Sequence, residues 1–314
     1  METLNKYNIY FHGEKGALMV LLFLCLIIGL SSPFFFNFTN IITILEQTTF
    51  IAIGAIGMTF VIISGGIDLS AGAILGGTSF FVLNLHANYG LNIYLTFLFG
   101  LLLGIFLGFL NGYLIAKFRL QSFIVTLCMM ISIRGMIPLI GDGSIYSFSD
   151  KFIFLTKGTI LSIPFSLFLL LVVILFAHII LNHTKIGRFI YAIGNNEKAA
   201  SLYGISNKKY KIYAYIMSGF SAALAGLVLA SRLNAVTTTT GRGYELDVIA
   251  AVVLGGTRLS GGEGGIVGSL IGALIIGVVH NGLNLLMVNS FVQQIIIGFV
   301  ILITVIFDSI RLND

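Results

Sequence analysis

The chain has 314 residues, of which 57% are hydrophobic and only 9% are charged, and its mean hydropathy is +1.04. A soluble domain cannot cover so much apolar surface with so few polar residues, so the composition excludes a water-soluble protein. The net charge of +5 would suggest nucleic acid as the partner of a soluble protein, but membrane proteins concentrate Lys and Arg on their cytoplasmic side. We therefore expect a helical membrane protein with no nucleic-acid partner.

Apolar runs of about 20 residues predict an all-α, polytopic fold with about ten membrane-spanning helices. The spans are expected at residues 17–35, 41–64, 68–86, 91–116, 121–140, 160–181, 211–231, 244–256, 263–288 and 290–308. With the N-terminus inside, the predicted cytoplasmic segments hold twelve Lys and Arg residues, against four outside, Lys151 and Lys157 among them. The sequence thus predicts a single transmembrane domain over residues 1–314, with both termini in the cytoplasm.

Glycine is abundant, with 37 residues, and one predicted span carries it at every fourth position. The four residues are Gly100, Gly104, Gly108 and Gly112. Because residues four apart lie on one helix face, this spacing predicts close packing against another helix. A pore lined by small residues is the alternative interpretation.

Two glycine-rich segments form a candidate internal repeat. Residues 65–72 (GGIDLSAG) and 255–262 (GGTRLSGG) share the pattern GGxxLSxG, and transporters are often built from repeats. The predicted topology puts both segments on one membrane side, whereas an inverted repeat needs opposite sides, so the repeat stays open. Residues 259–263 (LSGGE) resemble an ATPase signature loop, but the chain has no G-x-x-x-x-G-K-[ST] loop. We expect a glycine-rich turn between helices there.

The longest polar passage, residues 183–211, holds six of the seventeen Lys and Arg residues. Its centre predicts a short helix with Asn196 as N-cap, Glu197 at the positive helix start and Gly204 as the stop. One face of this helix is expected to carry Ala199, Leu202 and Tyr203. Two helical turns are marginal alone in water, so we expect the helix to dock on a partner in the cytoplasm. The basic residues that follow it can also contact anionic membrane lipid.

Polar side chains within or near the predicted spans are costly in lipid and are therefore candidates for a translocation path or a gate. They are Asp68, Asn111, Arg134, Glu245, Asp247 and Asn281. We expect Glu245 and Asp247 to face the outside, where a carboxylate accepts hydrogen bonds from sugar hydroxyls. The alternatives are an ion pair with Arg242 or Arg232 and a cap at a helix N-terminus. Asn111 and Asn281 are expected to form hydrogen bonds between helices rather than to line a path.

The sequence predicts no metal site and no catalytic set. His280 has no second histidine or carboxylate at ligand spacing, and no Ser/His/Asp order or HExxH motif is present. Few charges lie within the spans, which argues against a pump driven by protons or sodium. An external motor is the remaining source of energy.

Seven segments together resemble the membrane permease subunit of bacterial ABC importers for monosaccharides, the ribose, xylose and galactose type. The matching segments are Ser64–Gly72, Gly108–Ala116, Phe123–Gly135, Gly187–Gly194, Asn196–Ile205, Gly243–Gly256 and Gly262–Leu285. Their order and spacing cover roughly residues 40–308. The resemblance implies a multi-pass subunit of the bacterial inner membrane that moves a monosaccharide by alternating access.

The resemblance also implies partners. They are a second permease copy, a cytoplasmic ATPase with two nucleotide-binding halves that holds ATP and Mg, and an extracytoplasmic sugar-binding protein. This chain would carry no cofactor and would not itself be an enzyme. The family's ATPase-coupling helix corresponds to Asn196, Glu197, Lys198, Ala199, Ala200, Leu202, Tyr203 and Gly204. A permease for nucleosides or branched-chain amino acids is the first alternative, and an ATP-independent channel or secondary transporter is the second.

Overall fold

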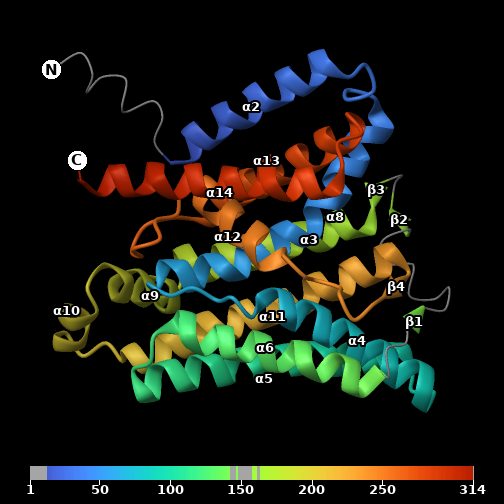
Figure 1. The fold of residues 1–314 in the computed structure, drawn as a ribbon. Coiled ribbons are helices and arrows are strands. Elements are labelled where there is room, and N and C mark those ends of the chain that lie inside the picture. Colours follow the sequence, from blue (N-terminus) through green and yellow to red (C-terminus); the bar gives the residue numbers. More distant parts are fainter. Residues whose placement is uncertain (1–12, 142–145, 148–157, 161–162, 314) are drawn as a thin grey trace, which may run out of the picture.

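The computed structural model describes residues 13–141, 146–147, 158–160 and 163–313 of the chain. Figure 1 shows helices that lie alongside one another between two ends of the molecule, one marked by α10 and the other by short strands. The helices are α2 (Glu14–Ser31), α3 (Phe38–Ile63), α4 (Ala71–Tyr89), α5 (Ile93–Phe118), α6 (Ser122–Gly141), α8 (Phe165–His178), η1 (Ile179–His183), α9 (Lys185–Asn195), α10 (Glu197–Leu202), α11 (Asn207–Leu233), α12 (Tyr244–Leu254), α13 (Ile266–Leu285) and α14 (Ser290–Asn313).

Two small antiparallel sheets lie at the end opposite α10, here called the strand end (Figure 1). They pair β1 (Tyr146–Ser147) with β4 (Ala235–Val236) and β2 (Thr159–Ile160) with β3 (Ile163–Pro164). The first residues of α2 and the last residues of α14 lie at the α10 end (Figure 1). The two described chain ends therefore share one side of the molecule, as the predicted topology requires.

Seven helical segments in the described part of the chain are long and apolar enough to cross a membrane: α2, α3, α5, α6, α8 continued by η1, α11 and α13. This confirms an all-α, multi-pass architecture, while the count of ten spans stays a prediction. Of these seven, α3, α11 and α13 are largely buried, whereas few residues of α2 and α8 are buried. Lys151 and Lys157 lie outside the described residues.

The predicted span at residues 244–256 is shorter than a membrane crossing. Helix α12 has 11 residues, which at 1.5 Å per residue is about 16 Å, roughly half the thickness of the hydrocarbon core. It begins beside the middle of α3, where the Tyr244 hydroxyl donates to the Phe50 carbonyl oxygen at 2.7 Å. From there α12 runs toward the α10 end, while α4 starts nearby and runs toward the strand end (Figure 1).

The glycine ladder of α5 packs directly on α11. A Cβ on Gly104 would lie 2.6 Å from the Gly219 carbonyl oxygen, and one on Gly219 would lie 2.9 Å from the Gly108 Cα. Because a Cβ contact under 3.0 Å forces atoms to move, only glycine allows the two backbones to come this close. The prediction of tight helix packing is confirmed for this face of α5.

The two GGxxLSxG segments meet at the α10 end. The Gly262 amide donates to the Ile63 carbonyl oxygen at 2.9 Å, and a Cβ on Gly261 would lie 2.9 Å from the Gly65 Cα. Both segments therefore lie on one side, as the predicted topology has it. Residues 258–263 form the expected glycine-rich turn between α12 and α13, closed by the Arg258–Glu263 ion pair at 2.8 Å.

The backbone shows how far the sequence match between these segments extends. Helices α3 and α12 end in two turns of the same type, in which Gly65 (φ 80°) and Gly256 (φ 90°) adopt the left-handed conformation. In the structure Gly65 is thus equivalent to Gly256. The sequence pattern instead aligns Gly65 with Gly255, one residue earlier. Beyond the turn the segments differ, since Gly72 lies in α4 whereas its sequence match, Gly262, is left-handed. The structure supports two similar helix ends and not a longer repeated unit.

Candidate functional site

The polar passage forms the short helix that the sequence predicts. The Asn196 side-chain oxygen accepts a hydrogen bond from the Ala199 amide at 2.9 Å and caps the N-terminus of α10. Gly204 ends it with φ 77°, and the Ile205 amide donates to the Ala200 carbonyl oxygen at 3.0 Å, closing a Schellman turn. The predicted cap and stop are both confirmed.

Helix α10 presents two large side chains to the exterior. Leu202 is 88% exposed and Tyr203 is 87% exposed, whereas Ala200 is buried against the rest of the chain. Lys198 is exposed as well, and Ala199 is half-buried. An apolar and an aromatic side chain so fully exposed on a helix of two turns are typical of a docking surface for another protein.

Two contacts tie α10 to the start of α11. The Lys211 ammonium group pairs with the Glu197 carboxylate at 2.6 Å, and the Asn207 side-chain amide donates to the Glu197 carbonyl oxygen at 2.8 Å. These bonds attach the first residue of α10 to the long helix α11. The start of α10 is therefore linked to α11 by side-chain contacts as well as by the chain itself.

The polar passage contains a second helix, α9, that the sequence analysis missed. Its buried residues are Gly187, Ile190 and Ile193, whose spacing of three residues is the helical signal in the sequence. The Tyr191 hydroxyl donates to the Gly264 carbonyl oxygen at 2.7 Å. Burial raises the pKa of Tyr191 above its ordinary value, so the hydroxyl keeps the proton that it donates.

Helix α9 ends on the junction of the two glycine-rich turns. A Cβ on Gly194 would overlap the Ile63 carbonyl oxygen and lie 2.5 Å from the Gly262 amide nitrogen. These two atoms form the hydrogen bond that joins the turn after α3 to the turn after α12. We call Ile63, Gly194 and Gly262 the glycine junction. Through it, α9 contacts the turn that leads from α3 into α4 and the turn that leads from α12 into α13.

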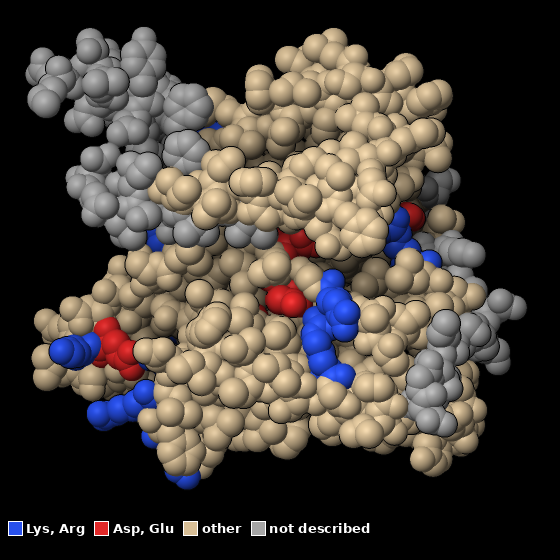
Figure 2. All heavy atoms as spheres, viewed as in Figure 1, with Lys and Arg blue, Asp and Glu red and all other residues tan. Residues whose placement is uncertain are grey.

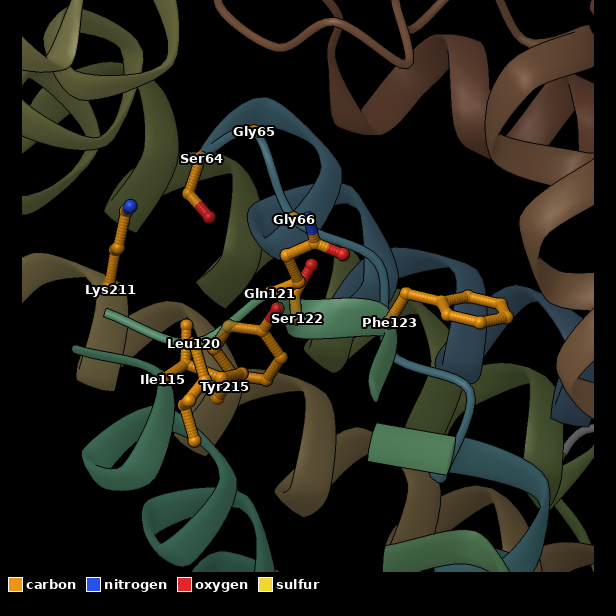
Figure 3. Close-up of a pocket in the computed structure, with 10 residues that line it drawn as sticks. All are labelled: Ser64, Gly65, Gly66, Ile115, Leu120, Gln121, Ser122, Phe123, Lys211 and Tyr215. Carbon is orange, nitrogen blue, oxygen red and sulfur yellow. The ribbon is translucent and has the colours of Figure 1, made fainter. Parts of the chain in front are cut away.

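A cavity of about 250 Å³ opens beside this junction, between the end of α3, the α5–α6 turn and α11 (Figure 3). Its polar lining includes Ser64, Ser122 and Lys211, and Tyr215 lines its apolar part. The Ser122 hydroxyl accepts a hydrogen bond from the Ile67 amide at 3.2 Å, so the cavity wall holds the turn that leads into α4. Lys211, whose ammonium group pairs with Glu197 of α10, therefore lines the same cavity as the turn after α3.

Asp68 is fully buried just before α4. One of its carboxylate oxygens accepts from the Ser70 amide at 2.9 Å and the Ser70 hydroxyl at 2.6 Å, and the other accepts from the Ser218 hydroxyl at 2.7 Å. The Asn111 amide nitrogen donates to the Ser70 hydroxyl at 2.8 Å. The expected hydrogen bond between helices is thus present for Asn111, and the Asp68 carboxylate stabilises the positive N-terminus of α4.

Arg134 on α6 joins the starts of α4 and α12. Its guanidinium group donates to the Gly241 carbonyl oxygen at 3.1 Å and pairs with the Glu245 carboxylate at 3.3 Å. A Cβ on Gly72 would lie 2.6 Å from the same Gly241 oxygen. Glu245 is therefore buried in the first turn of α12, and its partner is Arg134 and not Arg242 or Arg232. The expected pairing was wrong, because residue order does not reveal that α12 starts beside α6, and Gly243 rather than either carboxylate occupies the N-cap of α12.

Two further polar pairs lie along α13. The His280 ring nitrogen lies 3.4 Å from the Asp247 carboxylate, a contact that the spacing of residues in the sequence does not indicate. Asn281 and Asn40 exchange hydrogen bonds of 2.9 and 3.1 Å through their side-chain amides. The expected bond between helices is thus present for Asn281.

Some of the charged residues around the start of α12 reach the surface, since Arg242 is exposed and Arg134 and Asp247 are half-buried, whereas Glu245 is buried. Figure 2 shows basic and acidic side chains gathered in the middle of a face that carries few other charges, about halfway between the α10 end and the strand end. The charged residues of this part of the fold are Arg134, Arg242, Glu245 and Asp247. Together with His280 they are called the central charge cluster below. Charges at this depth face lipid only at a high cost, so a partner or a water-filled path must cover them.

Comparison with known proteins identifies the family. Residues 40–305 match the family model described as branched-chain amino acid transport system / permease component. This chain belongs to that permease family. As a permease it is a transport component and a multi-pass membrane protein, in agreement with the helices described above.

Curated relatives match over almost the whole chain. The permease is 43% identical over 301 residues to the ribose import permease protein RbsC of Escherichia coli K12, and the match covers 94% of each chain. It is 44% identical over 311 residues to RbsC of Bacillus subtilis, covering 96% of this chain and 95% of the relative. The D-allose transport system permease protein AlsC of Escherichia coli K12 is 35% identical over 303 residues, covering 96% and 93%. The predicted resemblance to monosaccharide permeases is confirmed. No solved structure matches the chain.

Proposed function

We propose that this chain is the transmembrane subunit of an ATP-driven importer of the bacterial inner membrane that carries a monosaccharide, with ribose as the first candidate. The observation that carries the proposal is the identity of 43% and 44% to two ribose import permeases over nearly the whole chain. A permease described for D-allose is less similar, at 35%. The gradient of identity favours ribose over other sugars.

The central charge cluster supplies suitable chemistry for a sugar path. Carboxylates accept hydrogen bonds from hydroxyl groups, and guanidinium groups donate them. One guanidinium nitrogen of Arg134 is buried and has no hydrogen-bond partner among the described residues, so it retains donor capacity. A second copy of the permease facing this surface would enclose the charges in a path between the two chains. Asp68, Asn111 and Asn281 support the walls of that path through their hydrogen bonds.

The exposed face of α10 is the docking surface for a cytoplasmic ATPase with two nucleotide-binding halves. Leu202 and Tyr203 would insert into the ATPase, and closure of that dimer would displace α10. The Glu197–Lys211 pair and the glycine junction would carry this displacement to the turn before α4 and to the end of α12. In this alternating-access scheme, those two helices open the path to one side at a time.

The charge distribution supports an orientation with α10 and both termini in the cytoplasm. Helices α9, α10 and the first turn of α11 carry the six basic residues of the polar passage. Lys and Arg are enriched on the cytoplasmic side of membrane proteins. The strand end would then face the extracytoplasmic sugar-binding protein, which delivers the substrate.

Reconstitution tests the substrate and the energy source. The permease, its ATPase and its binding protein are placed in proteoliposomes, and uptake of radiolabelled ribose, allose, leucine and adenosine is measured with and without ATP. We expect ATP-dependent ribose uptake. Leucine or adenosine uptake in place of ribose would refute the substrate class, and ribose uptake without ATP would refute the importer.

Substitutions on α10 test the docking surface. Leu202→Ala with Tyr203→Ala should abolish co-purification of the ATPase and ribose uptake. Met287→Ala is the matched control, because Met287 is 92% exposed in the loop between α13 and α14, at the strand end. Association unchanged by the double substitution would show that the ATPase binds elsewhere.

A further inference from the structure

A group of lysines joins α5 to α11 near the base of α10. The Lys117 ammonium group donates to the Tyr113 hydroxyl at 2.6 Å, and the Lys208 ammonium group lies 5.4 Å from the centre of the same ring. Lys117 belongs to the last turn of α5 and Lys208 to the first turn of α11. Two like charges from different helices thus meet on one aromatic ring.

This group has no acidic partner among the described residues. The printed sequence places Arg119 and Lys209 next to the two lysines, and both are exposed. The nearest carboxylate along α10 and α11, that of Glu197, is already paired with Lys211. Like charges held this close repel one another, so binding of an anion here is favoured by several positive charges at once.

The surface that continues from the lysines is apolar. Phe106 and Phe109 precede Tyr113 and Lys117 along α5 at spacings of three and four residues, which puts all four on one helix face. Phe106 is 53% exposed and Phe109 is 39% exposed, and the Phe109 and Tyr113 rings stack at 5.8 Å. The distance along the helix from Phe106 to Lys117 is about 16 Å, roughly half of the hydrocarbon core.

We infer that Lys117, Lys208 and Tyr113 bind the phosphate of an anionic phospholipid, whose acyl chain lies along Phe109 and Phe106. A phosphate accepts hydrogen bonds from both ammonium groups, and the stripe of aromatic rings has the length of one leaflet. The lipid bridges the end of α5 and the start of α11. It thereby fixes the base to which α10 is attached through Lys211.

Lipid retention tests this site in the full permease. The protein is placed in nanodiscs of phosphatidylcholine with a titrated fraction of phosphatidylglycerol, and bound phosphatidylglycerol is counted by native mass spectrometry. Each lysine near an anionic surface is expected to contribute about fivefold in affinity, so Lys117→Gln with Lys208→Gln should weaken binding about 30-fold. Lys185→Gln with Arg188→Gln is the matched control, because it also removes two exposed charges at the same end, and no ring contact is found for either residue within the described part of the chain.

Three outcomes would overturn the inference. The first is equal retention of phosphatidylglycerol by the double variant and the control, which would mean that charge at this end acts without a defined site. The second is equal binding of phosphatidylcholine and phosphatidylglycerol by the unaltered permease. The third is displacement of phosphatidylglycerol from these lysines by millimolar inorganic phosphate, which would identify a free phosphate as the ligand. The native topology of each variant is checked by size-exclusion chromatography.

Discussion

Replacing Gly194 by alanine should disconnect ATP hydrolysis from transport while leaving the ATPase bound. A Cβ at this position would overlap the Ile63 carbonyl oxygen and lie 2.5 Å from the Gly262 amide nitrogen. Those two atoms form a hydrogen bond of 2.9 Å, so the new methyl group would enter between its donor and its acceptor. The bond must lengthen or α9 must move away.

The destabilisation of the glycine junction has two sources, overpacking by the new methyl group and loss of the hydrogen bond between Gly262 and Ile63. An inserted methyl group in a packed site costs about 1–3 kcal/mol, and a backbone hydrogen bond contributes about 1 kcal/mol. The junction would thus be destabilised by about 2–4 kcal/mol. Because about 1.4 kcal/mol is a factor of ten in rate, a barrier to transport raised by half of this destabilisation should lower coupled transport about 5- to 30-fold.

The assay compares uptake, ATP hydrolysis and ATPase association in the same proteoliposomes. Uptake should fall about tenfold, ATP hydrolysis should lose its stimulation by loaded binding protein, and association should persist because the α10 surface is unchanged. Gly135→Ala is the control, since a Cβ there meets no atom within 4 Å and alanine gains the same helix propensity. Wild-type uptake by Gly194→Ala would refute the role of the glycine junction, and so would an equal loss in the control.

Three other experiments test the interior contacts. Arg134→Met should leave the buried Glu245 carboxylate unpaired and cost about 3–5 kcal/mol, measured as loss of monodisperse protein on heating in detergent, and adding Glu245→Gln should restore much of that loss. A double-mutant cycle of Asn40→Ala and Asn281→Ala should give a coupling of about 0.6 kcal/mol, and zero coupling would contradict the amide pair. Gly108→Ala should push α5 off the α11 backbone and so lower the temperature at which half of the monodisperse protein is lost. A midpoint temperature equal to that of Gly135→Ala would contradict the close packing.

Local features were predictable where the chemistry is local. A cap, a helix stop and a run of apolar residues depend on neighbours within a few positions, so the sequence predicts α10 with Asn196 and Gly204 at its ends. The four-residue glycine spacing likewise predicts the close contact of α5, although it does not name α11 as the partner. Helix α9 was missed because only Gly187, Ile190 and Ile193 are buried, and it lies in a passage whose basic residues drew attention to α10.

By itself the sequence determined the solvent, the helical class and the family of this permease, because each rests on composition or on motifs read in order. Only the tertiary structure decided which polar groups meet. Arg134 and Glu245 stand 111 positions apart, and Ile63 is bonded to Gly262 across almost 200 residues. Such pairs depend on how the helices pack and on α12 starting at mid-depth. Neither of these can be predicted from a local sequence pattern. The polar passage at residues 183–211 predicts a docking helix, and its contacts supply the route from that helix into the bundle.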